Sequence, residues 1–194
     1  FSKLLENIYR AVNIGFINEM KHIAQKLNID IYDAILAAKT KPYGFRPFIP
    51  GPGIGGHCIP IDPYFLSWKA KKHGANSDFI KLAGVTNELT LERIINRVIN
   101  FIKQTNKKKP KILIIGLAYK KNVDDDRESP AWKVIKNLQK LNYEVSVYDN
   151  YVSTFDKKNI KKRIKKLDYK KNYFDCSVIL TDHSKVDYKK IYQI

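Results

Sequence analysis

The order of apolar and polar residues divides the chain into a helical first half and a second half in which helix and strand patterns alternate. From the first residues to Leu27, apolar side chains recur every three or four positions, which is the period of an amphipathic helix. The residues that carry this pattern are Leu4, Ile8, Ala11, Val12, Phe16, Met20, Ile23 and Leu27. We therefore expect a long first helix with one apolar side.

Capping residues predict where the next helices begin and end. Asp30 is an N-cap residue by type and predicts a short helix to about Lys39. Asp62 and Pro63 together predict an N-cap and the first position of a third helix, which ends at Gly74.

A fourth helix is predicted to be much longer than the others. Ser77 is its predicted N-cap, and its apolar period continues to about Thr105. At 3.6 residues per turn this helix has about eight turns, which is long enough to connect two domains.

Beyond a charged linker at residues 106–111, the pattern changes to strands. Strands are predicted at Lys111–Gly116, Glu144–Asp149 and Cys176–Thr181, with a helix capped by Ser129 between the first two. A strand, helix and strand in this order form a parallel sheet. The predicted fold class is therefore α/β, a helical central domain with a long connecting helix followed by a Rossmann-like parallel-sheet domain. The predicted divisions are 1–76, 77–106 and 107–194.

Composition excludes several classes of protein. The chain of 194 residues has 36 Lys plus Arg against 19 Asp plus Glu, a net charge of +17, which raises the possibility of nucleic-acid binding. Only six of those cations are Arg and the excess is spread out, so we do not expect a nucleic-acid reader. The densest run, Lys157–Lys171, is predicted to be a solvated helix or loop.

Other features exclude membrane-spanning proteins and small folds held together by disulfides or metal ions. No apolar run approaches about 18 residues and no secretion leader is visible, so a cytoplasmic protein without a membrane segment is expected. Two cysteines cannot form a disulfide-rich scaffold, and no Cys/His cluster has zinc spacing, so no metal site is predicted.

The most informative segment is the glycine- and proline-rich stretch from Thr40 to Pro63. Its glycines leave the backbone bare where a ligand would approach, and Cys58 follows them just before a helix N-terminus. Exposed amides and a helix dipole favour a thiolate, so Cys58 is a candidate nucleophile. The alternative, a small buried apolar residue among turn-forming glycines, is equally open from the residues alone. Cys176, among apolar strand residues, is predicted to fill the core, and no role is assigned to His57.

A second glycine lies at the end of the first predicted strand. Gly116 stands without the two further glycines of a dinucleotide-binding turn, and Asp149 lies 33 residues after it, beyond the spacing of about 20 for a ribose-binding acid. NAD binding is not expected here. Lys120, Lys121 and Arg127 nevertheless fall where ligands bind in such folds, at the carboxyl edge of the sheet.

Taken together, these segments resemble the UDP-glucose/GDP-mannose dehydrogenase family, and in particular its UDP-N-acetylhexosamine branch. The resemblance covers residues 1 to about 182. The motifs that carry it are Lys3-Leu-Leu-Glu-Asn7, Thr40-Lys-Pro-Tyr-Gly-Phe, Gly51-Pro-Gly-Ile-Gly-Gly-His-Cys58 through Asp62, Gly116-Leu-Ala-Tyr-Lys-Lys and Asp126-Arg-Glu-Ser-Pro.

The resemblance implies an NAD-dependent oxidation of the C6 alcohol of a UDP-hexose to a uronate. Members have an NAD-binding Rossmann domain before the two domains matched here, so NAD is expected to bind mainly outside this chain. The abrupt helical start and the end at Ile194 agree with a chain shortened at both ends, which would be inactive alone. A homodimer through the central helices is also implied.

The resemblance further implies roles for individual residues. Cys58 would form a thiohemiacetal and then a thioester, Lys3 and Asn7 would donate hydrogen bonds to the oxyanion, and Asp62 would position water. Arg127 would reach NAD. Substrate contacts are implied for Ile49, Gly51, Gly53, Gly55, Tyr119, Lys120 and Arg46, with Lys41 an alternative to Arg46 and Asn18 a further candidate.

A different class of function remains open beside this one. The same chain would also suit a non-catalytic module that binds nucleotides or dimerises without oxidising anything. Calorimetry with UDP-sugars distinguishes a chain that binds nucleotide sugars from an inert one.

Overall fold

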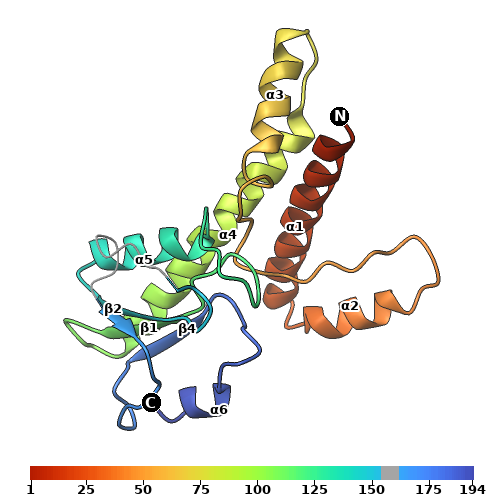
Figure 1. The fold of residues 1–194 in the computed structure, drawn as a ribbon. Helices are drawn as coiled ribbons and strands as arrows, with labels where there is room; N and C mark the ends of the chain where they lie inside the picture. The colour runs from red at the N-terminus through yellow and green to blue at the C-terminus, as the bar shows by residue number, and fades with distance from the viewer. Residues whose placement is uncertain (154–161) are drawn as a thin grey trace. The chain divides into compact units, whose positions relative to one another are not determined.

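The computed structural model describes residues 1–153 and 162–194 of the chain (Figure 1). They form two compact units, Phe1–Thr90 and Leu91–Ile194. The elements are α1 (Ser2–Lys26), α2 (Ile31–Lys39), α3 (Asp62–Lys72), α4 (Asp78–Gln104), β1 (Lys111–Ile115), α5 (Pro130–Lys140), β2 (Glu144–Tyr148), β3 (Lys162–Ile164), β4 (Cys176–Ile179) and α6 (Tyr188–Ile191).

The first unit is helical, with α1 packed against α2 and α3. The buried side of α1 is narrower than its apolar band, because Phe16, Ile23 and Leu27 remain exposed. Part of the buried side is instead polar, since Asn7 and Asn18 are each only 3% exposed. Buried amides need hydrogen-bond partners, so we expect both asparagines to bind polar groups of other segments.

In the first unit, the helix starts confirm one capping prediction and correct two. Asp30 caps α2, and its carboxylate accepts the N–H of Tyr32. Asp62 does not cap α3, because the N-cap is Ile61 and Asp62 already lies in the first turn without a capping bond. The Ser77 hydroxyl, just before α4, is buried without a hydrogen-bond partner among the described residues, so it makes no cap either.

The second unit is built on a four-stranded sheet in the order β3-β2-β1-β4, with every pairing parallel. The central strand β1 pairs with β2 from Lys111 opposite Glu144 to Ile115 opposite Tyr148. Ser129 caps α5 as expected, and Pro130 occupies its first turn. The α/β class and the parallel sheet are therefore confirmed.

Alternation along β1 places apolar side chains on both faces of the sheet, as expected of a strand covered on both sides. Ile112 and Ile114 join one core with α5 and the second half of α4, whereas Leu113 and Ile115 join another with α6 and the chain end. All four side chains are fully buried. Both faces of the sheet are therefore covered by apolar side chains. Polar groups are expected at its carboxyl edge, where the strands end.

Two elements lie where the sequence predicted none. Part of the Lys-rich run 157–171 forms the strand β3, with Ile164 buried, and not a solvated helix or loop; residues 157–161 of that run lie outside the described residues. The short helix α6 was also not predicted.

The described residues contain neither a membrane-spanning helix nor a cluster of metal-binding side chains. None of the helices there is both long and apolar enough to span a membrane. No cluster of three or more His, Cys, Asp or Glu that could hold a metal ion occurs in residues 1–153 and 162–194.

Candidate functional site

The first part of the candidate site joins α1 to the start of α3. The Asn7 amide nitrogen donates a hydrogen bond of 2.5 Å to Asp62 Oδ2, across 55 positions of sequence. Because Asp62 makes no capping bond, its carboxylate is turned toward α1. Two of the residues expected in the site are therefore in direct contact.

Arg10 completes this contact from the other side of the amide. Its Nη2 donates to Asn7 Oδ1 at 2.5 Å, and it also lies 3.8 Å from Glu6. A guanidinium only donates and a carboxylate only accepts, so the two partners fix which way the Asn7 amide points. Arg10, Asn7 and Asp62 form one polar chain.

Cys58 lies at the turn that leads into α3. Its carbonyl oxygen accepts the N–H of Ile61 at 3.0 Å and that of Asp62 at 2.8 Å. The residue is partly buried rather than enclosed in the core. Lys3 lies one helical turn before Asn7 and is exposed, as is His57.

The glycine loop is fastened to α1 by a second asparagine. The N–H of Gly51 donates to Asn18 Oδ1 at 2.9 Å, which leaves the buried Asn18 Nδ2 without a partner among the described residues. Gly53 has φ +119°, a backbone conformation that favours glycine. Gly55 is partly buried, whereas Ile49 and Arg46 are exposed.

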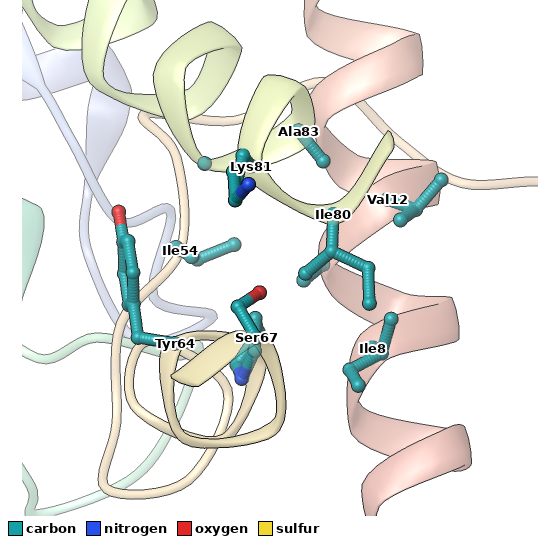
Figure 2. Close-up of a pocket in the computed structure, with 11 residues that line it drawn as sticks. Ile8, Val12, Ile54, Tyr64, Ser67, Ile80, Lys81 and Ala83 are labelled. Carbon is teal, nitrogen blue, oxygen red and sulfur yellow. The ribbon is translucent and has the colours of Figure 1, made fainter. Parts of the chain in front are cut away.

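A small apolar hollow lies beside this loop, between α1, α3 and the first part of α4 (Figure 2). Its residues are Ile8, Ala11, Val12, Ile54, Pro63, Tyr64, Ser67, Ile80, Lys81, Ala83 and Gly84. Within this hollow, the centre of a water molecule can occupy a volume of only about 10 Å³. The hollow has room for about one water and not for a sugar nucleotide.

The second unit carries its own group of candidate residues, on the loop after β1. The side chain of Asp149, at the end of β2, accepts the N–H groups of Leu117 (2.6 Å), Ala118 (3.0 Å), Tyr151 (2.7 Å) and Val152 (2.9 Å). Burial alone would raise the pKa of this carboxyl, but the four N–H donors together hold its pKa below 3.8.

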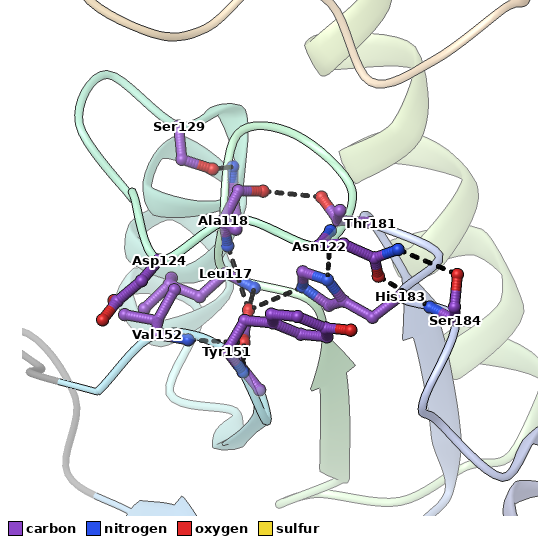
Figure 3. Close-up of polar contacts among 12 residues, drawn as sticks. Leu117, Ala118, Asn122, Asp124, Ser129, Tyr151, Val152, Thr181, His183 and Ser184 are labelled. Carbon is purple, nitrogen blue, oxygen red and sulfur yellow. Dashed lines mark hydrogen bonds and ion pairs between the residues drawn. The ribbon is translucent and has the colours of Figure 1, made fainter.

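His183 extends the same network (Figure 3). It is completely buried, its Nε2 lies 3.0 Å from Asp149 Oδ2, and its Nδ1 accepts the N–H of Asn122 at 3.0 Å. Tyr151 stacks on the imidazole with 4.7 Å between ring centres. The Thr181 hydroxyl donates to the Ala118 carbonyl at 2.6 Å.

The residues expected to contact ligands lie on this loop. Tyr119 is partly buried, and its N–H donates to the Asp125 carbonyl at 3.0 Å, while Lys120 is exposed. The Asp125 carboxylate accepts two hydrogen bonds from the Arg127 guanidinium, at 2.9 and 2.7 Å, and one from the Arg127 backbone N–H at 3.0 Å. Each unit therefore carries a group of the expected residues.

Sequence reasoning missed three residues of these networks. Arg10 has the pattern of an exposed helix residue, and only its spacing of three from Asn7 hinted at a contact. His183 lies two residues beyond the predicted strand Cys176–Thr181 and was given no role. Asp149 was noticed, but only as a poor ribose ligand, and its bonds to the loop backbone have no sequence signal.

Two sequence profiles of one family match nearly the whole chain. The central domain of the UDP-glucose/GDP-mannose dehydrogenase family matches residues 1–89. The UDP binding domain of the same family matches residues 113–194.

Individual proteins agree with these profiles. The chain is 38% identical over 182 residues to a UDP-N-acetyl-D-mannosamine dehydrogenase of Methanococcus vannielii, which covers 94% of this chain and 40% of that protein. It is 32% identical over 157 residues to a UDP-N-acetyl-D-glucosamine 6-dehydrogenase of Pseudomonas aeruginosa, covering 80% and 37%. The chain therefore spans about two fifths of the length of these relatives.

Solved structures show the same similarity. The UDP-D-ManNAc dehydrogenase of Pyrococcus horikoshii has a TM-score of 0.79 at 32% identity, covering 98% of this chain and 44% of that one. An NDP-N-acetyl-D-galactosaminuronic acid dehydrogenase of Methanosarcina mazei has a TM-score of 0.84 at 26% identity, covering 99% and 43%.

Proposed function

Because the chain belongs to the UDP-glucose/GDP-mannose dehydrogenase family, we propose that it is the substrate-binding and catalytic-thiol part of an NAD-dependent nucleotide-sugar 6-dehydrogenase. The substrate would be a UDP-hexose, and the names of its relatives favour a UDP-N-acetylhexosamine. The product would be the corresponding uronate.

The observation that carries this proposal is the contact of Asn7 with Asp62 next to the Cys58 turn. It joins an amide donor, a carboxylate and a thiol-bearing residue that are far apart along the chain. The same three residue types suit the addition of a thiol to an aldehyde and, after the thiohemiacetal has been oxidised, the hydrolysis of the thioester. A purely structural contact would not require the cysteine to remain partly exposed.

In the proposed reaction, the Cys58 thiolate adds to the C6 aldehyde formed by oxidation of the alcohol. The developing oxyanion would accept hydrogen bonds from Asn7 Nδ2 and from the Lys3 ammonium. Asn7 has two amide hydrogens, so one can remain on Asp62 while the other is donated to the substrate.

A second oxidation converts the thiohemiacetal into a thioester on Cys58. The Asp62 carboxylate would then orient a water molecule and accept its proton as the water attacks the thioester carbonyl. Hydrolysis releases the uronate and regenerates the thiol. Asp62 is suited to this role because no helix cap occupies its oxygens.

Substrate contacts are proposed on both units. Ile49, Gly51, Gly53 and Gly55 would pass their backbone along the sugar nucleotide, and the unpartnered Asn18 Nδ2 is a further donor beside that loop. Tyr119 and Lys120 would contact the nucleotide, with Arg46 as a cation near the sugar.

NAD, when bound, supplies the hydride acceptor for both oxidations. The residues after β1 do not fit this cofactor, because the Asp149 carboxylate is filled by backbone N–H groups and cannot take a ribose hydroxyl. We therefore propose that NAD binds mainly through residues outside this chain. Arg127 would reach it after leaving Asp125.

A homodimer through the helical unit is part of the proposal. Large apolar side chains are exposed on α1 and α4, including Phe16 (57%) and Phe79 (70%). Such side chains favour burial against a partner. Sedimentation of the wild-type protein and a Phe16→Glu variant tests this, since the variant should sediment as a monomer.

The function is tested in a chimera in which this chain replaces the matching segment of the Methanococcus vannielii relative. NADH formation and uronate are measured with UDP-N-acetylmannosamine, UDP-N-acetylglucosamine and UDP-glucose. Cys58→Ser should abolish uronate formation, while Cys176→Ser, in strand β4 of the second unit, should retain it. Full turnover by the Cys58→Ser chimera would refute the assignment.

A further inference from the structure

The loop from Gly116 to Asn122 is fixed at both ends by one buried carboxylate. At the near end, Asp149 Oδ2 accepts the N–H groups of Leu117 and Ala118 directly. At the far end, the Asn122 N–H donates to His183, which in turn contacts the same oxygen of Asp149.

The contacts determine which nitrogen of His183 carries the proton. The Asn122 N–H must donate, so Nδ1 is an acceptor and has no proton. Nε2 then carries the proton and donates it to Asp149 Oδ2. His183 therefore accepts a hydrogen bond from the Asn122 N–H at Nδ1 and donates one to Asp149 from Nε2.

Neither Asp149 nor His183 is available to a ligand. Both side chains are fully buried, and the carboxylate already accepts five hydrogen bonds. In dinucleotide-binding folds the acid at this strand end takes a ribose hydroxyl. Here the same position is used to hold the loop backbone.

We infer that Asp149 and His183 are positioning residues that fix both ends of the Gly116–Asn122 loop and so present Tyr119 and Lys120 to the nucleotide. The inference deepens the proposed function and rests on it for the identity of the ligand. Its physical basis is pre-organisation, because a loop that is already ordered loses less entropy when it binds.

The first readout is hydrogen exchange of individual amides in the 194-residue chain. Asp149→Asn leaves one uncharged acceptor oxygen in place of two charged ones, so the bonds from Leu117 and Ala118 are weakened or lost whichever way the amide points. These two amides should exchange faster by about tenfold or more, while the β1 amides stay protected. His183→Gln keeps a donor for Asp149 but loses the Nδ1 acceptor, so only the Asn122 amide should exchange faster.

The second readout is UDP affinity by calorimetry. Asp149→Asn should weaken binding by about tenfold, because the loop must be ordered at the moment of binding. The matched control is Asp182→Asn, which removes an exposed carboxylate that pairs with Lys121 on the same loop. Exposed ion pairs contribute little, so this variant should bind UDP as the wild type does.

Each alternative outcome has a definite meaning. Unchanged exchange at Leu117 and Ala118 in Asp149→Asn, or equally faster exchange in β1, overturns the positioning role. Faster loop exchange with undiminished UDP affinity overturns it too. If Asp149→Asn does not fold, the Asn122-specific effect of His183→Gln decides. Wild-type protein that binds no UDP refutes the proposed function instead, and the exchange results are then explained by loop stability alone.

Discussion

The side chains of Asn7 and Asp62 are joined by a hydrogen bond of 2.5 Å, although 55 positions separate them in sequence. This bond ties the first helix to the turn that carries Cys58. Arg10 holds the opposite end of the same amide. The proposed chemistry therefore depends on a polar contact between two elements and not on a preformed deep pocket.

Replacing Asp62 with Asn should allow the thioester on Cys58 to form but prevent its hydrolysis. An amide oxygen at position 62 can still accept from Asn7, so the fold should survive, but an amide cannot take a proton from water. We expect turnover of the chimera to fall by about a hundredfold or more. A uronoyl thioester on Cys58 should accumulate and be visible as an added mass on the intact protein.

Asp33→Asn is the control for that experiment, because Asp33 is exposed in the first turn of α2. Its turnover should equal that of the wild type. Asp62→Asn protein that loses activity without an added mass on Cys58 would contradict the role in thioester hydrolysis.

Removing Arg10 should lower activity by releasing Asn7. Without the guanidinium, the amide of Asn7 is held only by Asp62 and can turn its oxygen toward the substrate. We expect Arg10→Met, which has no donor, to lower kcat by about tenfold with little change in KM, because an oxyanion contact acts in the transition state. Arg10→Lys should restore part of the rate, since an ammonium also donates to the Asn7 oxygen.

Glu6→Gln provides the matched control for Arg10. This substitution removes the charge of the exposed Glu6 carboxylate, which lies 3.8 Å from the Arg10 guanidinium. The hydrogen bond from Arg10 to Asn7 is kept. Steady-state kinetics of Glu6→Gln should match the wild type. An equal loss of kcat in both variants would mean that the ion pair matters and the orientation of Asn7 does not.

Acid should destabilise the second unit through Asp149. Its pKa is lowered in the folded state, so the folded protein binds a proton less readily than the unfolded chain. The stabilisation is therefore complete above the ordinary pKa of 3.8 and is lost as the pH falls through the lower folded pKa. Urea unfolding at a series of acidic pH values should show this loss, and Asp149→Asn should remove that part of the pH dependence.

The prediction of elements from sequence succeeded where the signal was local. Asp30 and Ser129 were identified as caps because an N-cap bond is made to the next turn of the same helix. Asp62 gave the same local signal, but Asn7 from another helix captured its carboxylate. The strand at 162–164 was missed because it is a three-residue edge strand within a Lys-rich run.

The candidate site shows the same division between local and distant information. The glycine loop and Cys58 were found because bare backbone next to a cysteine is a local pattern. His183 and Asp149 lie 34 positions apart and meet only through the parallel sheet. A single sequence does not report which buried polar groups will pair across a fold, so the loop anchors were not predicted.

Gly116→Ala should destabilise the protein strongly, because a Cβ at this residue would lie 2.4 Å from the Thr181 carbonyl oxygen. The backbone there also has φ +83°, which side chains rarely adopt. We expect the free energy of unfolding to fall by about 2 kcal/mol or more. Gly51→Ala is the matched control, since, apart from its chain neighbours, none of the described residues has an atom within 4 Å of its Cβ position and no unusual φ is required. Its unfolding midpoint in urea should stay close to that of the wild type, and equal midpoints for the two variants would show that Gly116 is not needed for the close approach to Thr181.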